Sequence, residues 1–372
     1  MTELKPPSRL LMGPGPSNVS YRVLRAMSTP ILGHLDPEFL KIMDQTSEML
    51  RQVFLTQNKL TIPVSGTGSS GMETAFVNVV EPGDTVIIGV KGVFGQRMVD
   101  VARRCGAEII EVKEEWGNPI PEEKMIDALK KHPEAKVCAI VHAETSTGVR
   151  QPIEEIGAFV RDTDTLFLVD AVTSLGGVPL RVDDWGIDVC YSATQKCLSV
   201  PPGLSPITIS TKAKEVITNR KQKVQSWYLD LNMLQNYWGK DRVYHHTAPI
   251  SIIYALWQGL VLILEEGLEK RWERHQRLGD ELKARMQDRG FKMFAKEGYR
   301  LPNLTAAYLP DGMEDLKARR RLLNEFDIEI GAGLGPVAGK IWRIGLMGET
   351  CTEGSITILI NAIDHIMNGG KV

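Results

Sequence analysis

The 372-residue chain lacks the features that mark several large protein classes. It has no run of about 18 apolar residues, so nothing in it predicts a membrane-spanning helix. The formal net charge is −2, which gives no general electrostatic attraction to nucleic acid or to an anionic membrane. A site that binds an anion in this chain therefore has to be a local one.

Cysteine is also scarce, and the five cysteines show no CxxC spacing. An odd, scattered set argues against a disulfide framework and against a zinc site, so we expect no bound metal. Residues 1–7 contain no apolar segment of the kind found in signal peptides. Together these absences predict a protein of the reducing cytoplasm.

Length and hydrophobic patterning predict two domains, because the chain is too long for one compact core. Strands are expected at 85–88, 108–112, 137–141, 166–170, 187–191 and 207–209. Helices are expected between them, at 71–80, 96–105, 122–131, 153–161 and 211–219. Nearly apolar strands separated by helices predict an α/β domain with a mostly parallel sheet that is covered on both faces.

The second domain is predicted from the helical pattern that follows. A long apolar segment at 249–266, with Pro249 at its expected start, precedes a charged helix at 268–289. We interpret the first as a bridge and the second as the entry to a smaller C-terminal α+β domain. The expected division is an N-terminal arm at 1–20, a large domain at 21–257 and a small domain at 258–372.

Two residues near predicted strand ends indicate the chemistry. Lys196 comes soon after the strand at 187–191, and Asp170 ends the strand at 166–170. Ligands of such sheets bind beyond the carboxyl ends of the strands. An enzyme of pyridoxal 5′-phosphate (PLP) needs a lysine for a Schiff base and an acid that keeps the pyridine nitrogen protonated. Most lysines after strands are only solvated surface groups, so Lys196 needs support from other residues.

A glycine- and hydroxyl-rich segment at 65–71 precedes a helix expected to begin near Met72. Free N–H groups at a helix start bind anions, and this segment suits one phosphate. It also matches GxGxxG, but a dinucleotide site requires an acid at the end of the next strand, where this chain has Ile88-Gly89-Val90. We therefore favour a phosphate over NAD, and a glycine-rich turn without a ligand remains the alternative.

Three further residues are candidates by position. Thr145 follows the strand at 137–141 and offers a hydroxyl, and Phe94 offers a ring for stacking. Taken singly, Thr145 is more often an ordinary polar loop residue, and an isolated phenylalanine is more often a core residue. Arg343 lies inside an apolar strand, where a buried guanidinium needs an anionic partner. Its planar fork fits a carboxylate, either of a substrate or of a structural acid.

Together these segments resemble the class V aminotransferases of PLP fold type I, in particular the alanine–glyoxylate and serine–pyruvate (serine–glyoxylate) group. The matching segments run in family order and are 13–18, 65–73, 81–84, 144–148, 169–177, 192–196, 244–247 and 342–345. The resemblance implies a large domain built on a seven-stranded sheet and a homodimer with active sites at its interface. It also implies transfer of an amino group from alanine or serine to glyoxylate or pyruvate, with ping-pong kinetics.

The resemblance implies roles for individual residues. Lys196 would form the Schiff base, and Asp170 would pair with the pyridine nitrogen. The implied cofactor-binding residues are Thr67, Gly68, Ser69, Phe94, Thr145, Asp170, Gln195, Lys196, Tyr244 and Thr247. Of these, Tyr244 and Thr247 would reach the phosphate of the neighbouring subunit. The implied substrate-binding residues are Gly15, Thr145 and Arg343. Phe94 and Ser69 stand where the animal enzymes have tryptophan and histidine, which bears on affinity more than on the reaction.

Related activities remain as alternatives. Ureidoglycine–glyoxylate aminotransferases are expected to differ near His34 and at Tyr244, and pyridoxamine–pyruvate aminotransferases are also relatives. A cysteine desulfurase needs a cysteine shortly before the substrate arginine, and residues 331–339 contain none. A PLP-binding regulatory subunit without turnover would have no need of Lys196, Asp170 and Arg343 together, and all three are present.

Overall fold

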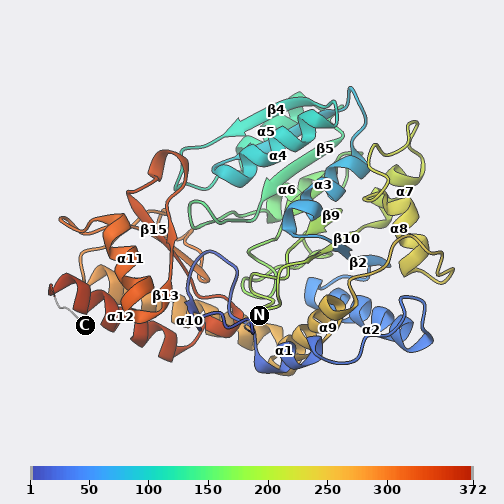
Figure 1. The fold of residues 1–372 in the computed structure, drawn as a ribbon. Coiled ribbons are helices and arrows are strands. Elements are labelled where there is room, and N and C mark those ends of the chain that lie inside the picture. The colour runs from blue at the N-terminus through green and yellow to red at the C-terminus, as the bar shows by residue number, and fades with distance from the viewer. Residues whose placement is uncertain (1–2, 370–372) are drawn as a thin grey trace.

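The chain folds into a larger and a smaller part, as seen in a computed structural model that describes residues 3–369 (Figure 1). Each part has its own main hydrophobic core. The larger core contains apolar residues from Val23 to Trp272. The smaller one contains Met12 and residues from Leu278 to Ile363. The predicted pairing of a large α/β part with a small α+β part is confirmed.

The large part is built on a seven-stranded sheet in the order β2-β10-β9-β8-β5-β3-β4. Their bounds, in the same order, are Leu60–Ser65, Leu204–Ile209, Val189–Tyr191, Leu166–Asp170, Val137–Val141, Thr85–Val90 and Glu108–Lys113. Only β10 runs against its neighbours, and the pairs from β9 to β4 are parallel. The predicted, mostly parallel seven-stranded sheet is therefore correct.

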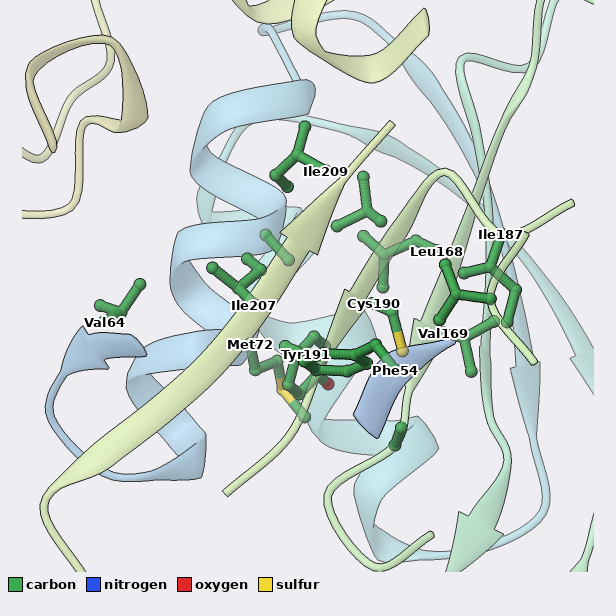
Figure 2. Packing of buried hydrophobic residues seen from close by; sticks show 14 of the residues in the cluster. Phe54, Val64, Met72, Leu168, Val169, Ile187, Cys190, Tyr191, Ile207 and Ile209 are labelled. Atoms are coloured by element: carbon green, nitrogen blue, oxygen red, sulfur yellow. The ribbon is translucent and has the colours of Figure 1, made fainter. Parts of the chain in front are cut away.

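The central strands are apolar because helices cover them. β5 and β8 are buried along their whole length, and Figure 2 shows Leu168, Val169, Cys190 and Tyr191 packed in the core. Helices that follow strands are α3 (Gly68–Val79), α4 (Val93–Arg104), α5 (Glu122–Lys131), α6 (Glu154–Val160) and α7 (Thr211–Thr218). The remaining helices of this part are α1 (Tyr21–Met27), α2 (Pro37–Phe54), α8 (Leu231–Trp238) and α9 (Ile250–Glu266).

Two helix starts differ from the sequence prediction. Helix α3 begins at Gly68 rather than near Met72, and α4 begins at Val93 rather than at 96. Glycine and serine favour helices only weakly, so their presence hides the first turn of α3. The earlier starts place Gly68, Ser69 and Phe94 in first turns, at the carboxyl edge of the sheet.

The small part contains a four-stranded antiparallel sheet in the order β11-β12-β15-β14. These strands are Lys292–Met293, Leu304–Tyr308, Ile341–Gly345 and Gly331–Ala332. Its long helices are α10 (Leu268–Gln287), α11 (Asp315–Phe326) and α12 (Glu353–Met367). The N-terminal arm joins this part, because β1 (Leu10–Leu11) pairs in parallel with β13 (Ile328–Glu329).

The domain boundary expected at 257/258 stays a prediction. That position lies inside α9, whose buried residues Leu260 and Ile263 belong to the larger core. Between residues 3 and 369, no single helix has the length and apolar character needed to cross a membrane. Only α9 and α10 taken together reach that length and composition, and they are bent by 83°.

Candidate active site

A cavity of about 160 Å³ lies at the carboxyl edge of the large sheet. It brings together many of the predicted residues, namely Thr67, Gly68, Ser69, Phe94, Thr145, Asp170, Gln195 and Lys196. They come from segments more than 100 residues apart. They meet because parallel strands present their carboxyl ends at one edge of the sheet.

One wall of the cavity is the start of α3. Thr67 precedes the helix with an extended backbone and makes no side-chain capping bond. The N–H groups of Gly68 and Ser69 stand before the first helical bonds, which Ser70 and Gly71 make to the carbonyl oxygen of Thr67. Such donors, aided by the helix dipole, suit a phosphate.

Two details of this wall fit a bound ligand. A Cβ at Gly68 would come 2.9 Å from Cβ of Ala193, so only glycine lets the chain run this close. Gln195 Oε1 is buried and has no hydrogen-bond partner among residues 3–369. Because a side-chain amide can turn to present its NH2 instead, Gln195 is available as a donor to a phosphate.

Asp170, at the end of β8, forms the base of the cavity. Its Oδ1 accepts a hydrogen bond of 2.8 Å from the N–H of Val172, and its Oδ2 accepts one of 2.8 Å from the hydroxyl of Tyr191. Burial raises the pKa of Asp170 to about 6, although both hydrogen bonds favour the charged form. The carboxylate is therefore mostly ionised at pH 7 and rigidly held.

Lys196 faces the N-terminal arm. Its Nζ donates to the carbonyl oxygen of Pro14, and a Cβ added to Gly15 would lie 2.7 Å from that Nζ. The hydroxyl of Ser17 donates to the Lys196 carbonyl oxygen at 2.9 Å, which fastens the lysine loop to the arm. Burial, followed by the charge of Arg343, lowers the pKa of Lys196 to about 8. The amine is therefore mostly charged at pH 7, but its neutral form is more abundant than that of an ordinary lysine.

Two neighbouring side chains, Thr173 and Arg97, hold Thr145 and Phe94 in the cavity wall. The hydroxyls of Thr145 and Thr173 are hydrogen-bonded at 2.6 Å, so Thr145 is buried with a fixed orientation. Arg97 lies over the ring of Phe94, 4.9 Å from its centroid, and its Nη1 donates to the hydroxyl of Ser69 at 3.5 Å. The arginine thus links the aromatic ring to the start of α3.

Arg343 on β15 reaches the cavity region from the small part. It is buried, its Nε donates to the carbonyl oxygen of Ala332 at 2.7 Å and its Nη1 to that of Thr145 at 3.3 Å. No ion pair involves it within residues 3–369. Burial lowers the pKa of Arg343 to about 10, although the charge of Glu144 opposes this shift, so the guanidinium stays charged at neutral pH.

Comparison with known proteins identifies the family. The chain matches the class-V aminotransferase family over residues 18–344, which is most of its length. It belongs to the class V aminotransferases.

Three solved relatives resemble this aminotransferase along nearly its whole length. An alanine–glyoxylate aminotransferase from Nostoc sp. is 50% identical, with 99% of this chain and 97% of its own covered and a TM-score of 0.97. A ureidoglycine–glyoxylate aminotransferase from Bacillus subtilis is 41% identical, with 100% and 96% covered and a TM-score of 0.97. A pyridoxamine–pyruvate aminotransferase from Mesorhizobium loti is 28% identical, with 96% and 92% covered and a TM-score of 0.92.

The cofactor of this class V aminotransferase is PLP, and the cavity fits it. The start of α3 and Gln195 would hold the phosphate, Asp170 would face the pyridine nitrogen and Phe94 would lie against the ring. The unpartnered Gln195 oxygen and the donors of Gly68 and Ser69 are the observations that agree with this placement.

Four predicted residues of the aminotransferase do not line the cavity of their own chain: Gly15 and Arg343, which contact its lining residues Lys196 and Thr145, and Tyr244 and Thr247. Tyr244 and Thr247 are exposed and follow α8, and the Tyr244 ring stands 5.1 Å from that of His34. Their predicted contact with a phosphate therefore needs a second subunit and remains a prediction.

Sequence reasoning missed Arg97 and the apolar lining residues Met72, Val141, Ala143 and Val172. A signal for Arg97 was present, because it stands three residues after Phe94 in a helix and therefore shares its face. Val141 and Val172 could have been found from their places at the ends of β5 and β8.

Proposed function

We propose that this aminotransferase transfers the amino group of alanine or serine to glyoxylate or pyruvate in a ping-pong reaction. The observation that carries the proposal is Arg343, a buried cation that lies beside a small cavity and forms no ion pair within residues 3–369. A guanidinium in this position suits the carboxylate that every amino acid and 2-oxo acid shares. The names of the Nostoc and Bacillus relatives favour glyoxylate as an acceptor.

The chain's own groups would divide the work as follows. When bound, PLP supplies an electron sink for the carbon that loses its proton. Asp170, as a carboxylate, keeps a proton on the pyridine nitrogen. Lys196 in its neutral form would remove the proton from the α-carbon of the substrate and would return it at the carbon that carries the PLP aldehyde, on the other side of the amino nitrogen. Arg343 fixes the substrate carboxylate, so that the α-hydrogen points to the Lys196 amine.

A panel of donors and acceptors tests this proposal. The PLP-loaded protein would be assayed with alanine, serine, glycine, (S)-ureidoglycine and pyridoxamine, each against glyoxylate and pyruvate. We expect alanine or serine to exceed the other donors in kcat/KM by at least about ten-fold, since small pockets discriminate single methylenes ~10–200-fold. If ureidoglycine or pyridoxamine is preferred, that alternative is correct. An absence of turnover with every donor would indicate a regulatory subunit.

The second candidate is ureidoglycine–glyoxylate transamination. The Bacillus subtilis enzyme of that name has the same TM-score, 0.97, as the Nostoc alanine–glyoxylate enzyme. Fold similarity thus favours neither activity. We rank alanine or serine first because Tyr244, which is expected to differ in ureidoglycine enzymes, is present here and packs against His34.

Arg343→Ala is expected to weaken binding of both amino acid and oxo acid. Loss of a charged hydrogen-bond partner costs about 1.5–3 kcal/mol, which corresponds to a rise in KM of about 10- to 150-fold. Steady-state kinetics for both half-reactions would measure it, with Arg319→Ala, in an ion pair with Asp315 on α11, as the control. An unchanged KM would mean that Arg343 only supports the fold.

We also propose that the active unit is a homodimer in the cytoplasm. Tyr244 and Thr247 are exposed, and the loop that carries Tyr244 packs on the loop that carries His34. Exposed large apolar side chains lie in these two loops, namely Ile31, Leu35, Val243 and Tyr244, and the exposed rings of Trp227 and Tyr228 pack against His245 and His246. Such surfaces are typical of interfaces. Light scattering that gives a monomer mass would reject the dimer.

The five cysteines are free and buried, which suits a reducing compartment such as the cytoplasm.

A further inference from the structure

Lys91 is a fully buried lysine beside the active site that the reaction above does not use. It follows β3 directly, is 1% exposed and does not line the cavity. Its Nζ donates a hydrogen bond of 2.6 Å to the carbonyl oxygen of Val141, the last residue of β5. The side chain therefore ties together the carboxyl ends of two neighbouring strands. An ammonium this deep requires negative charge nearby.

Two buried carboxylates supply that charge. Glu144 on β6 (Ala143–Glu144) is 0% exposed, and a Cβ on Gly92 would lie 2.4 Å from its Cδ, so its carboxyl packs against the residue after Lys91. Asp170 is aligned with Val141, the acceptor of Lys91, in the β5–β8 ladder. Burial lowers the pKa of Lys91 to about 8, while Glu144 and then Asp170 oppose this shift, so the amine is mostly charged at pH 7.

Glu144 in turn organises two cavity walls. Its Oε1 accepts hydrogen bonds from the N–H of Ser146, at 3.1 Å, and from the Ser146 hydroxyl, at 2.5 Å. Its Oε2 accepts a weaker one, at 3.4 Å, from the N–H of Gly95. Gly95 follows Phe94, and Ser146 follows Thr145. One carboxylate thus holds both the turn that carries the ring and the loop that carries the hydroxyl.

We propose that Lys91 is a positioning residue of the active site, whose buried charge balances Glu144 and Asp170 and holds the chain segments that carry Phe94, Thr145 and Asp170 in one arrangement. The inference rests on the PLP-dependent reaction proposed above, but it does not depend on which amino acid is the donor. Lys91 acts through these neighbours and touches neither the cavity nor the reacting atoms.

The other titratable groups around this cluster do not replace Lys91. His142 is buried, and its burial and then the charge of Lys91 lower its pKa to about 3, so it is neutral. Tyr191 stays a neutral donor, because burial and Asp170 raise its pKa well above the usual value. Arg343 also interacts with Glu144, which raises its pKa, and Lys196 lowers the pKa of Asp170, but Arg343 is assigned to the substrate carboxylate and Lys196 loses its proton in the reaction. Without Lys91, Glu144 and Asp170 would repel each other in a dry site, and Asp170 would take up a proton at higher pH.

The test compares Lys91→Met with Lys283→Met. Lys283 on α10 is also buried, at 5% exposed, and burial likewise lowers its pKa to about 8. Unlike Lys91, it lies away from the cavity, and its acidic partner is Asp280, at 3.7 Å. PLP affinity of the cofactor-free protein would be measured from pH 6 to 9, beside thermal unfolding. For Lys91→Met we expect the dissociation constant at pH 7 to rise about ten-fold or more. The acid limb of binding should move up by about one pH unit. Lys283→Met should leave both unchanged.

The double variant Lys91→Met/Glu144→Gln separates charge balance from loss of a buried side chain. It removes one positive and one negative charge, so it should recover much of the PLP affinity that Lys91→Met loses.

A Lys91→Met protein that keeps the wild-type PLP affinity and pH profile would overturn the proposal. So would a fall in melting temperature like that of Lys283→Met with no change in PLP binding. If Lys91→Met does not fold, the double variant decides: a folded, PLP-binding protein supports the charge balance, and an unfolded one refutes it. Because PLP binding needs no amino donor, a wrong donor assignment would leave these results unaffected.

Discussion

Lys196→Ala is expected to lower the kcat of transamination by at least about 10³-fold. The substitution removes the amine that moves the proton, and general acid–base groups alone contribute about 10²–10⁴-fold. The start of α3, Gln195 and Asp170 are unchanged, so PLP should still bind through its phosphate and ring nitrogen. The measurement is single-turnover and steady-state kinetics with the best donor pair, together with PLP retention after gel filtration.

Lys214→Ala is the matched control for this result, because Lys214 is an exposed lysine on α7. It should keep wild-type kinetics. Substantial turnover in Lys196→Ala that exceeds trace contamination would show that another group moves the proton. A protein that retains no PLP would instead show that Lys196 is needed to anchor the cofactor.

Asp170→Asn is expected to lower kcat by about 10²–10³-fold, a range typical for loss of one preorganised electrostatic contact. A neutral amide cannot hold a proton on the pyridine nitrogen. Asparagine can still accept the hydrogen bond from the N–H of Val172 through its single oxygen, and its NH2 can donate to the hydroxyl oxygen of Tyr191, so the cavity should keep its shape. Kinetics of the two half-reactions would measure the loss, and activity near the wild-type value would remove Asp170 from the mechanism.

The same substitution should stabilise the cofactor-free protein. The folded-state pKa of Asp170 is raised from 3.8 to about 6, so folding favours the protonated form and the contribution to stability falls as pH rises through 6. A shift of roughly two units corresponds to about 3 kcal/mol at most. Asp170→Asn cannot ionise, so its free energy of unfolding should exceed that of the wild type above pH 6 and not at pH 4. Urea unfolding at both pH values tests this opposition between stability and activity.

Much of the sheet and of the site could be predicted, because both follow from local patterns. The apolar runs that end at Val141 and Asp170 have the bounds that were expected. In contrast, β2 was not among the predicted strands, since Pro63 interrupts its pattern. The strand tolerates Pro63 because it lies at the edge of the sheet. Helices α1 and α2 were also missing from the prediction.

The role of Lys91 is not predictable from the sequence, for a different reason. Lysine is usually exposed. The amine of Lys91 bonds to the end of a strand that lies 50 residues further along the chain, and nothing near Lys91 in the sequence indicates this contact. Burial of a polar side chain depends on which distant segments fold over it. The chemistry at strand ends can therefore be inferred from sequence, whereas the layer of residues that supports it requires coordinates.

The N-terminal arm has a consequence for how the protein is made. Leu10 pairs with Ile328, Met12 belongs to the smaller core, and Pro14 meets the amine of Lys196. During synthesis the arm leaves the ribosome long before its strand partner exists, and such distant pairings form late. A fragment that ends before residue 328 would have all the predicted residues of the cofactor cavity. Such a fragment would lack β13 and much of the smaller core, so the N-terminal arm would have no strand to pair with. Catalytic competence should therefore arise only once the last strands have been made.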